Sequence, residues 1–143
     1  MKLLFDASAL LNIIRLRKQD AYRLLKGNLT LSLTKYEVGN ALWKEALLLK
    51  RVNINETLET ISLIDRVLKT METVNPSNPS LTLNLAYKLQ TTYYDASYIA
   101  ASAEKNAKLI TDDTKLTRKV EKYINTIQKI LGRKPEISSS NKI

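Results

Sequence analysis

Several acidic residues of this chain stand where their carboxylates could act together. Asp6 directly follows a short apolar run, Glu37 lies in the first turn of a predicted helix, and Asp95 begins another predicted helix. Asp112 and Asp113 directly follow another apolar run. Carboxylates gathered in one pocket repel one another, which raises their pKa values, and a divalent cation removes that repulsion by using them as ligands. Bound Mg²⁺ or Mn²⁺ would suit hydrolysis of a phosphodiester bond, because the metal neutralises the phosphate and activates a water.

Helix capping offers a structural interpretation of each acid. Asp6 and Asp95 are good N-cap residues, and Glu37 forms a capping box with Thr34, three residues before it. One of the two acids at 112 and 113 could cap the helix that follows. A cap contributes about 1 kcal/mol, which is enough to explain each acid singly. Together, acids that follow separate strands along one edge of a basic protein favour a metal site.

The composition narrows the possible chemistry. The chain has 143 residues, the size of one domain, and contains no Cys and no His. Disulfide frameworks, cysteine nucleophiles, zinc fingers, iron–sulfur clusters and Ser-His-Asp triads are therefore excluded. Any metal must be bound by oxygen atoms, which favours Mg²⁺, Mn²⁺ or Ca²⁺. Acid–base chemistry must come from carboxylates, Lys, Tyr or metal-bound water.

The charge of the chain predicts an anionic partner. Lys and Arg number 23 against 14 Asp and Glu, which gives a net charge of +9 and a pI near 9.7. Such a protein attracts polyanions, nucleic acid above all. Both ends of the chain are basic and its middle is acidic. No apolar stretch approaches the roughly 20 residues of a membrane span, and no signal-peptide pattern is present, so we expect a soluble cytoplasmic protein.

The acids would be positioned by short strands that alternate with helices. The apolar runs at 2–5, 29–32 and 108–111 predict buried strands, and 72–75 predicts a further short one. Helical spacing and caps predict helices at 6–14, 20–26, 34–50, 53–71, 80–90, 95–106 and 114–123, while 125–130 fits either an edge strand or a helix extension. The alternation is typical of an α/β sandwich with a mainly parallel sheet. We expect one domain over residues 1–131 and a flexible polar tail at 132–143.

An open parallel sheet binds ligands at the carboxyl ends of its strands. The acids that follow the predicted strands would therefore lie along one edge of the sheet. Asn40 follows Glu37 by three residues and shares its helix face, and Ser8 follows Asp6 by two residues, so both could reach the same pocket.

Four segments carry these acids in order along the chain. They are FDASALLNI at 5–13, YEVGNALW at 36–43, YDASYIAASA at 94–103 and LITDDTKL at 109–116. Together they resemble the acidic motifs of the PIN-domain nucleases, and among these the VapC-type toxins of prokaryotic toxin–antitoxin pairs. The likeness runs from residue 2 to about residue 127.

The resemblance implies a PIN-like three-layer α/β/α sandwich with a short, mainly parallel central sheet. It also implies an Mg²⁺- or Mn²⁺-dependent endoribonuclease that hydrolyses RNA phosphodiester bonds, forms a homodimer and is silenced by a small VapB-type antitoxin. The residues that match the catalytic and metal-binding acids of the family are Asp6, Glu37, Asp95 and Asp113.

The resemblance assigns supporting roles to other residues of the same motifs. Ser8, Asn40 and Thr111 would orient the carboxylates or waters around the metal. Asp112 occupies the variable position of the T-x-D motif, so a bond to the metal would pass through a water.

Basic and aromatic residues near these motifs are candidates for contacts with RNA. The last predicted helix carries a basic stripe of Lys115, Arg118, Lys119 and Lys122, and Arg15, Arg17 and Lys18 follow the first helix. A solvated helix face explains the stripe equally well. Tyr93 and Tyr94 could stack on a base beside Asp95, although packing into the core is the favoured interpretation. Trp43 and the leucines at 47–49 favour a core or a dimer interface.

Other functions fit parts of this pattern. A PIN-type nuclease in RNA processing or DNA repair would have no antitoxin, and a neighbouring antitoxin gene would distinguish the two. A basic nucleic-acid-binding protein without catalysis would use the acids only as caps, and divalent metal would not affect it. A receiver-type phosphoacceptor also uses Mg²⁺ and carboxylates, but the Lys arrangement it requires is not recognisable here.

Overall fold

Five short parallel strands form the centre of the molecule. The computed structural model describes residues 1–143. Its sheet has the order β3-β2-β1-β4-β5, and every neighbouring pair is parallel. The strands are β1 (Leu3–Phe5), β2 (Leu29–Leu31), β3 (Glu72–Val74), β4 (Lys108–Ile110) and β5 (Ile137–Ser138). The expected parallel sheet is thus confirmed, with one strand more than the sequence predicts.

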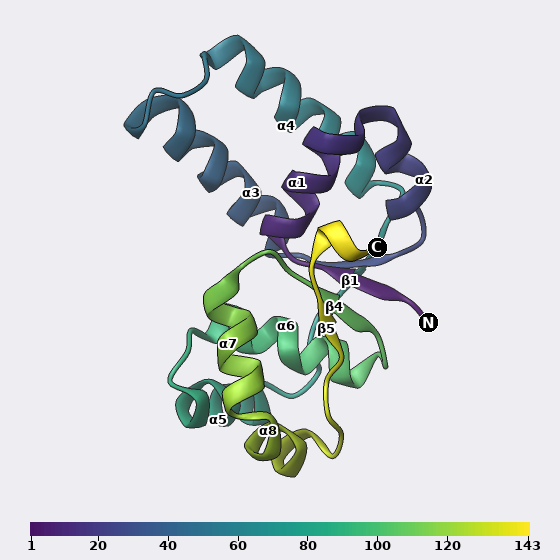
Figure 1. The fold of residues 1–143 in the computed structure, drawn as a ribbon, viewed down its shortest axis with the longest axis vertical. Helices are drawn as coiled ribbons and strands as arrows, with labels where there is room; N and C mark the ends of the chain where they lie inside the picture. The colour runs from purple at the N-terminus through teal and green to yellow at the C-terminus, as the bar shows by residue number, and fades with distance from the viewer.

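Helices cover both faces of this sheet (Figure 1). On one face lie α1 (Ala7–Arg17), α2 (Ala21–Leu25), α3 (Thr34–Trp43) and α4 (Ile54–Leu68), and on the other lie α5 (Pro79–Leu89), α6 (Tyr93–Glu104), α7 (Thr114–Lys122) and α8 (Ile124–Leu131). Successive strand residues point to opposite faces, so Leu4 enters the hydrophobic cluster beneath α5–α8 and Phe5 enters the cluster beneath α1–α4. The chain is a three-layer α/β/α sandwich, as expected.

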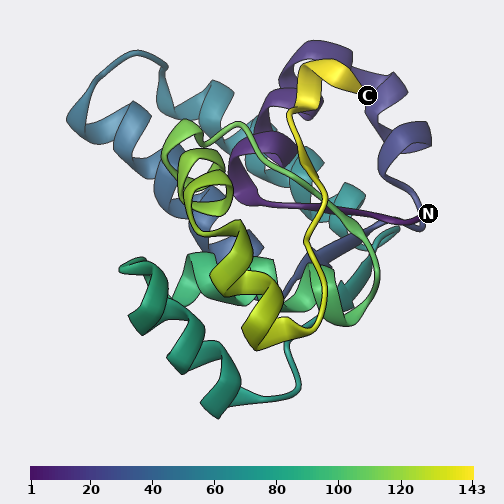
Figure 2. The same cartoon turned by 60° about the horizontal axis from the view of Figure 1, so that its bottom comes forward.

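One helical hairpin extends beyond the sheet in both views (Figures 1 and 2). We call residues 34–68 the α3–α4 hairpin. Helix α3 continues into a π-helical turn at Lys44–Leu48. Asn53 then caps α4, as predicted, because its side chain accepts a hydrogen bond from the Glu56 amide at 2.9 Å. No helix of the chain is both long enough and apolar enough to cross a bilayer.

Two other predicted caps are wrong. The N-cap of α3 is Leu33, and no side chain caps that helix. Thr34 lies inside the helix, where its buried hydroxyl accepts from the Leu31 amide at 3.2 Å and pairs with the Tyr98 hydroxyl at 2.7 Å. Thr92 caps α6, which places Asp95 in the first turn rather than at the cap. Tertiary hydrogen bonding therefore takes Thr34 away from the capping role that its sequence spacing suggests.

The C-terminal residues differ most from the sequence prediction. Residues 124–131 form a helix, and the expected flexible tail instead carries β5 along β4. The Leu109 amide donates to the Glu136 carbonyl and the Thr111 amide to the Ser138 carbonyl, both at 2.9 Å. A 3₁₀ turn follows at Ser140–Lys142. A two-residue strand is too short for a periodic pattern, so the sequence gives no sign of it.

Candidate active site

The carboxyl ends of β1 and β4 bring Asp6 and Asp113 to one edge of the sheet. The register pairs Phe5 with Ile110, so the residues that follow these two strands lie next to each other. Asp6 caps α1 by accepting from the Ala9 amide at 2.9 Å, and it is only 6% exposed. Asp6 therefore both caps α1 and lies at the proposed site, so the two interpretations of this acid are compatible.

Two hydroxyls hold the Asp6 carboxylate in place. The Ser8 hydroxyl donates to Oδ1 at 2.7 Å, and the Thr111 hydroxyl donates to Oδ2. Burial raises the pKa of Asp6, and repulsion from Asp113 adds to the shift, while the hydrogen bonds from Ala9, Thr111 and Ser8 oppose it. Ser8 and Thr111, which were predicted to orient carboxylates or waters around a metal, both contact Asp6.

Asp113 caps α7 with one of its two carboxylate oxygens. Oδ1 accepts from the Lys115 amide at 2.9 Å and from the Leu116 amide at 3.2 Å. The Asp113 amide donates to the Thr111 hydroxyl at 3.1 Å, which connects the loop after β4 to Asp6. Because the cap occupies Oδ1 alone, Oδ2 is free of hydrogen bonds within the chain.

Glu37 reaches the same edge from the first turn of α3. The buried hydroxyl of Tyr98 donates to Glu37 Oε1 at 2.6 Å. Burial raises the pKa of Glu37, the hydrogen bond from Tyr98 lowers it, and repulsion from Asp6 and Asp95 raises it further. Burial and the bond to Glu37 also raise the pKa of Tyr98, so its hydroxyl remains a donor.

Asp95 approaches from the first turn of α6. Its Oδ2 accepts from the Thr91 hydroxyl at 3.3 Å. Burial raises the pKa of Asp95, and repulsion from Asp113 adds to the shift, whereas the hydrogen bonds from Thr91 and Thr92 lower it.

These four acids form what we call the acid-lined edge: Asp6, Glu37, Asp95 and Asp113. Each of them repels at least one of the others strongly enough to affect a pKa. None takes part in any of the salt bridges of the structure. No group of three or more acidic side chains stands close enough together to enclose an ion directly. The edge is therefore a negatively charged surface rather than a closed cage.

Asp112 belongs to a different network from its neighbour Asp113. Its Oδ1 accepts from the Ser140 amide at 2.8 Å, and its Oδ2 accepts from the Ser140 hydroxyl and from Asn12 at 2.7 Å. Burial alone would raise the pKa of Asp112, but the hydrogen bonds from Ser140 and Asn12 outweigh burial and lower it. Asp112 therefore connects the loop after β4 to the C-terminal segment and to α1.

Asn40 shows no comparable contact. It lies exposed one turn beyond Glu37, and its side chain makes no hydrogen bond within the chain. The structure places it on the helix that carries Glu37, at the spacing that the sequence predicts.

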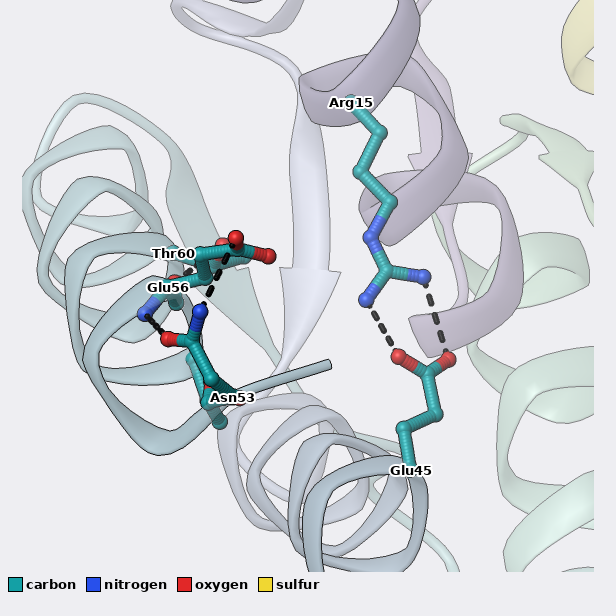
Figure 3. Close-up of polar contacts among 6 residues, drawn as sticks. Arg15, Glu45, Asn53, Glu56 and Thr60 are labelled. Atoms are coloured by element: carbon teal, nitrogen blue, oxygen red, sulfur yellow. Dashed lines mark hydrogen bonds and ion pairs between the residues drawn. The ribbon is translucent and has the colours of Figure 1, made fainter. Parts of the chain in front are cut away.

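Three of the predicted RNA-contacting cations are engaged within the fold. Arg15 forms a two-pronged ion pair with Glu45 of the α3–α4 hairpin (Figure 3). Arg17 donates to an oxygen of Ile143 at 2.7 Å. The Lys119 ammonium donates to two backbone carbonyls at the end of α5, at 3.0 and 2.9 Å. The remaining predicted cations are exposed: Lys18, Lys115, Arg118 and Lys122.

Sequence reasoning missed several residues that shape this site. Tyr98 follows Asp95 by three residues in a helix, so helical spacing could have suggested it, but its partner Glu37 lies 61 residues away. Thr91 and Ser140 carry no motif. The expectation that Tyr93 and Tyr94 pack into the core is wrong, because both are exposed. Trp43 is also exposed, so of its two predicted roles a place in the core is wrong.

Known proteins resemble this chain in sequence and in structure. No protein-family model matches it. It is 34% identical to Ribonuclease VapC3 of Pyrobaculum aerophilum over 126 residues. The matched region covers 83% of this chain and 95% of that protein. It is 32% identical over 95 residues to Exonuclease VapC9 of the same organism, covering 66% of this chain and 68% of that protein. The crystal structure of PAE2754 from P. aerophilum superposes with a TM-score of 0.74 at 27% identity, over 99% of this chain and 85% of that chain.

Proposed function

The chain belongs to the VapC family of PIN-domain nucleases, and on that premise we propose that it is a metal-dependent endoribonuclease. The observation that carries the proposal is the acid-lined edge. Its four carboxylates are mutually repelling, none is paired with a basic side chain, and they belong to a chain of net charge +9. A protein that keeps acids unpaired amid an excess of Lys and Arg is suited to bind a cation there.

The donor set of this edge fits Mg²⁺ or Mn²⁺. All its side-chain donors are carboxylate oxygens, which these hard cations prefer. Asp6, Glu37, Asp95 and Asp113 would hold the metal, some of them through waters, because no three of them are close enough to enclose it directly. When bound, the metal neutralises the phosphate of the substrate and supplies an acidified water as the nucleophile. Asp112 lies outside this set, because Ser140 and Asn12 occupy its oxygens.

Polar side chains of the chain hold these carboxylates in position. Ser8 and Thr111 fix both oxygens of Asp6, Tyr98 fixes one oxygen of Glu37, and Thr91 fixes one oxygen of Asp95. Such outer hydrogen bonds hold metal ligands in place and typically affect metal affinity or activity by about 10- to 100-fold. Asn40, exposed beside Glu37, would orient a water of the bound metal.

The excess positive charge would attract the RNA. The acid-lined edge alone repels a phosphate backbone, whereas a net charge of +9 attracts it over a longer range. Exposed Lys115, Arg118 and Lys122 lie on α7, the helix that Asp113 caps, so we assign phosphate contacts to them and to Lys18. Arg15, Arg17 and Lys119 contribute to the field while they hold the fold together.

We further propose that the chain is a toxin with a VapB-type antitoxin and that it forms a homodimer. The support is the apolar surface of the α3–α4 hairpin. A groove of about 440 Å³ lies between its helices, lined among others by Leu42, Trp43, Leu47, Ile54 and Ile61. Large exposed apolar patches mark protein-binding surfaces.

Cleavage of a circular RNA tests the nuclease proposal. An endonuclease linearises a circle, whereas an exonuclease, the activity named for VapC9, cannot start on one. We expect the wild type to cleave the circle with Mn²⁺ or Mg²⁺ and to lose activity in EDTA. Asp6→Asn should be inactive while it remains folded, since Asn also caps a helix. Asp20→Asn, at an exposed acid after the end of α1 opposite to Asp6, serves as the matched control. Cleavage that survives both EDTA and Asp6→Asn would contradict the metal mechanism.

The toxin role has its own test. The small protein encoded beside this gene, expressed together with the chain, should copurify with it and suppress cleavage. An active nuclease with no such neighbouring gene and no copurifying protein would favour a role in RNA processing.

A further inference from the structure

A second hollow lies beside the acid-lined edge, on the opposite face of the sheet from the α3–α4 hairpin. It has a volume of about 590 Å³ and is lined by the end of α5, the connecting residues and the start of α6. Tyr87, Lys88, Gln90, Thr91 and Tyr93 are among its lining residues. Its size lies within the range of small-ligand sites, which is roughly 300–1,000 Å³.

The hollow adjoins the proposed catalytic carboxylates through one residue. Thr91 lines it, and the same Thr91 hydroxyl donates to Oδ2 of Asp95 at 3.3 Å. A group bound in the hollow would therefore lie within one side chain of Asp95. Nucleotides next to a scissile phosphate need such a position, because their bases project from the backbone beside it.

The side chains of the hollow suit a base rather than a phosphate. Tyr87 is 78% exposed and Tyr93 is 40% exposed, so ring surface is open to solvent at both. Aromatic rings that stack on bases contribute about 1–3 kcal/mol per base and tolerate any sequence. Lys88 in the same lining supplies one positive charge for the attached phosphate. Gln90 offers an amide to a base edge.

The fold holds this region in place before any ligand binds. Helix α5 ends at Leu89, and the C-cap residue Gln90 has a left-handed backbone with a φ of 53°. Lys119 of α7 donates to the carbonyls of Leu89 and Gln90 at 3.0 and 2.9 Å, which fixes that end. A preorganised wall of this kind lowers the cost of binding.

We propose that this hollow is a base-binding subsite for single-stranded RNA, in which Tyr87 and Tyr93 stack on an unpaired base next to the cleaved phosphate. The proposal rests on the proposed nuclease function, and it assigns that nuclease a single-stranded substrate. In a duplex the bases are stacked within the helix and cannot enter the hollow.

Binding of short labelled RNAs tests the subsite separately from catalysis. Fluorescence anisotropy in EDTA would compare a single-stranded RNA of about ten nucleotides with an abasic RNA of the same length and charge. We expect the wild type to bind the base-bearing RNA more tightly. Tyr87→Ala and Tyr93→Ala should each weaken that binding about 5- to 50-fold and leave the abasic RNA unaffected. Tyr87→Phe should retain wild-type binding, because stacking does not need the hydroxyl.

Tyr36→Ala is the matched control. Tyr36 is also an exposed tyrosine, but it lies on the α3–α4 hairpin. A wild type that binds both RNAs equally, or variants that weaken both equally, would overturn the proposal. So would sedimentation showing that Tyr87→Ala dissociates an oligomer without changing the preference for bases, since a second copy would then cover the hollow. A wild type that prefers bases but never cleaves with Mn²⁺ would refute the nuclease function and leave the subsite standing.

Discussion

The acid-lined edge and the α3–α4 hairpin depart from ordinary folding chemistry in opposite directions. At the edge, carboxylates are buried or half-buried without a basic partner, and burial raises the pKa of Asp6, Glu37 and Asp95. On the hairpin, large hydrophobic side chains lie in solvent: Trp43, Leu47, Leu48, Leu49, Ile54 and Leu58. Burying unpaired carboxylates costs stability in the isolated chain, whereas the exposed apolar side chains only fail to contribute the free energy that their burial would supply. Each would fit a partner of complementary chemistry, the proposed cation at the edge and the proposed protein partner at the hairpin.

The two regions also differ in how they are held. Hydrogen bonds between distant residues fix the carboxylates of the edge, such as Thr111 to Asp6 and Tyr98 to Glu37. Local bonds stabilise the end of the hairpin, where Asn53 and Glu56 bond each other at the start of α4 (Figure 3). The Arg15–Glu45 ion pair connects this part of the hairpin to α1. Tertiary hydrogen bonds therefore hold the edge, whereas the outer end of the hairpin, beyond its buried Val38, Leu42, Ile64 and Val67, is held mainly by bonds within its own helices.

The largest expected effect separates two adjacent acids. Asp113→Asn should lower kcat/KM for RNA at least about 100-fold, since it removes a metal ligand, whereas Asn still caps α7. Asp112→Asn should lower it less than about tenfold, because that carboxylate only ties the loop to Ser140 and Asn12. Steady-state cleavage of one RNA by both variants measures this. Equal losses of kcat/KM in the two variants would contradict the assignment of Asp113, and not Asp112, to the metal site.

A second variant tests preorganisation of the edge. Tyr98→Phe removes the donor to Glu37 without changing the packed ring, so Mn²⁺ affinity or kcat should fall about 10- to 100-fold. The unfolding free energy should fall by about 1–3 kcal/mol, because the buried Thr34 hydroxyl keeps the bond from the Leu31 amide but loses its bond to Tyr98. Calorimetric titration with Mn²⁺ gives the first quantity and denaturant unfolding the second. Wild-type Mn²⁺ affinity with reduced stability would make Tyr98 a purely structural residue.

A third variant tests the hairpin. Leu47→Glu places a charge in the apolar groove and should weaken binding of the copurifying partner at least about tenfold. The free energy of unfolding should change by less than about 0.5 kcal/mol, since Leu47 is exposed in the isolated chain. Leu16→Glu, at an exposed leucine of α1, is the control for surface charge. A strongly destabilised Leu47→Glu would mean that the hairpin packs its own leucines.

The smallest expected effect is a pH dependence of stability without metal. Folding raises the pKa of Asp6, so its contribution to stability is complete below its unfolded pKa of about 4 and is lost as the pH rises through its folded pKa. In EDTA, Asp6→Asn should therefore melt at increasingly higher temperature than the wild type between pH 4 and pH 7. Mn²⁺ should close that gap at pH 7. A difference in melting temperature that does not vary with pH would mean that ionising the buried Asp6 carboxyl does not destabilise the fold.

The sequence predicts the strands and the acids at their ends because both depend on neighbouring residues. Asp6 follows an apolar run, and the parallel register then brings it to the residues after β4. The partners that orient these acids depend instead on how helices are rotated against the sheet. Tyr98 meets Glu37 and Ser140 meets Asp112 across 61 and 28 residues, and no local pattern encodes either contact. The same reason explains the capping box that Thr34 fails to form.

The proposed function depends above all on a divalent metal bound at the acid-lined edge. A crystal of the full chain grown with Mn²⁺, with diffraction measured at an energy where manganese scatters anomalously, tests this claim directly. The expected result is an anomalous peak on the acid-lined edge, bound directly by an oxygen of at least one of its four carboxylates and through waters by the others. An edge without such a peak at saturating Mn²⁺, or manganese bound only elsewhere, would contradict it.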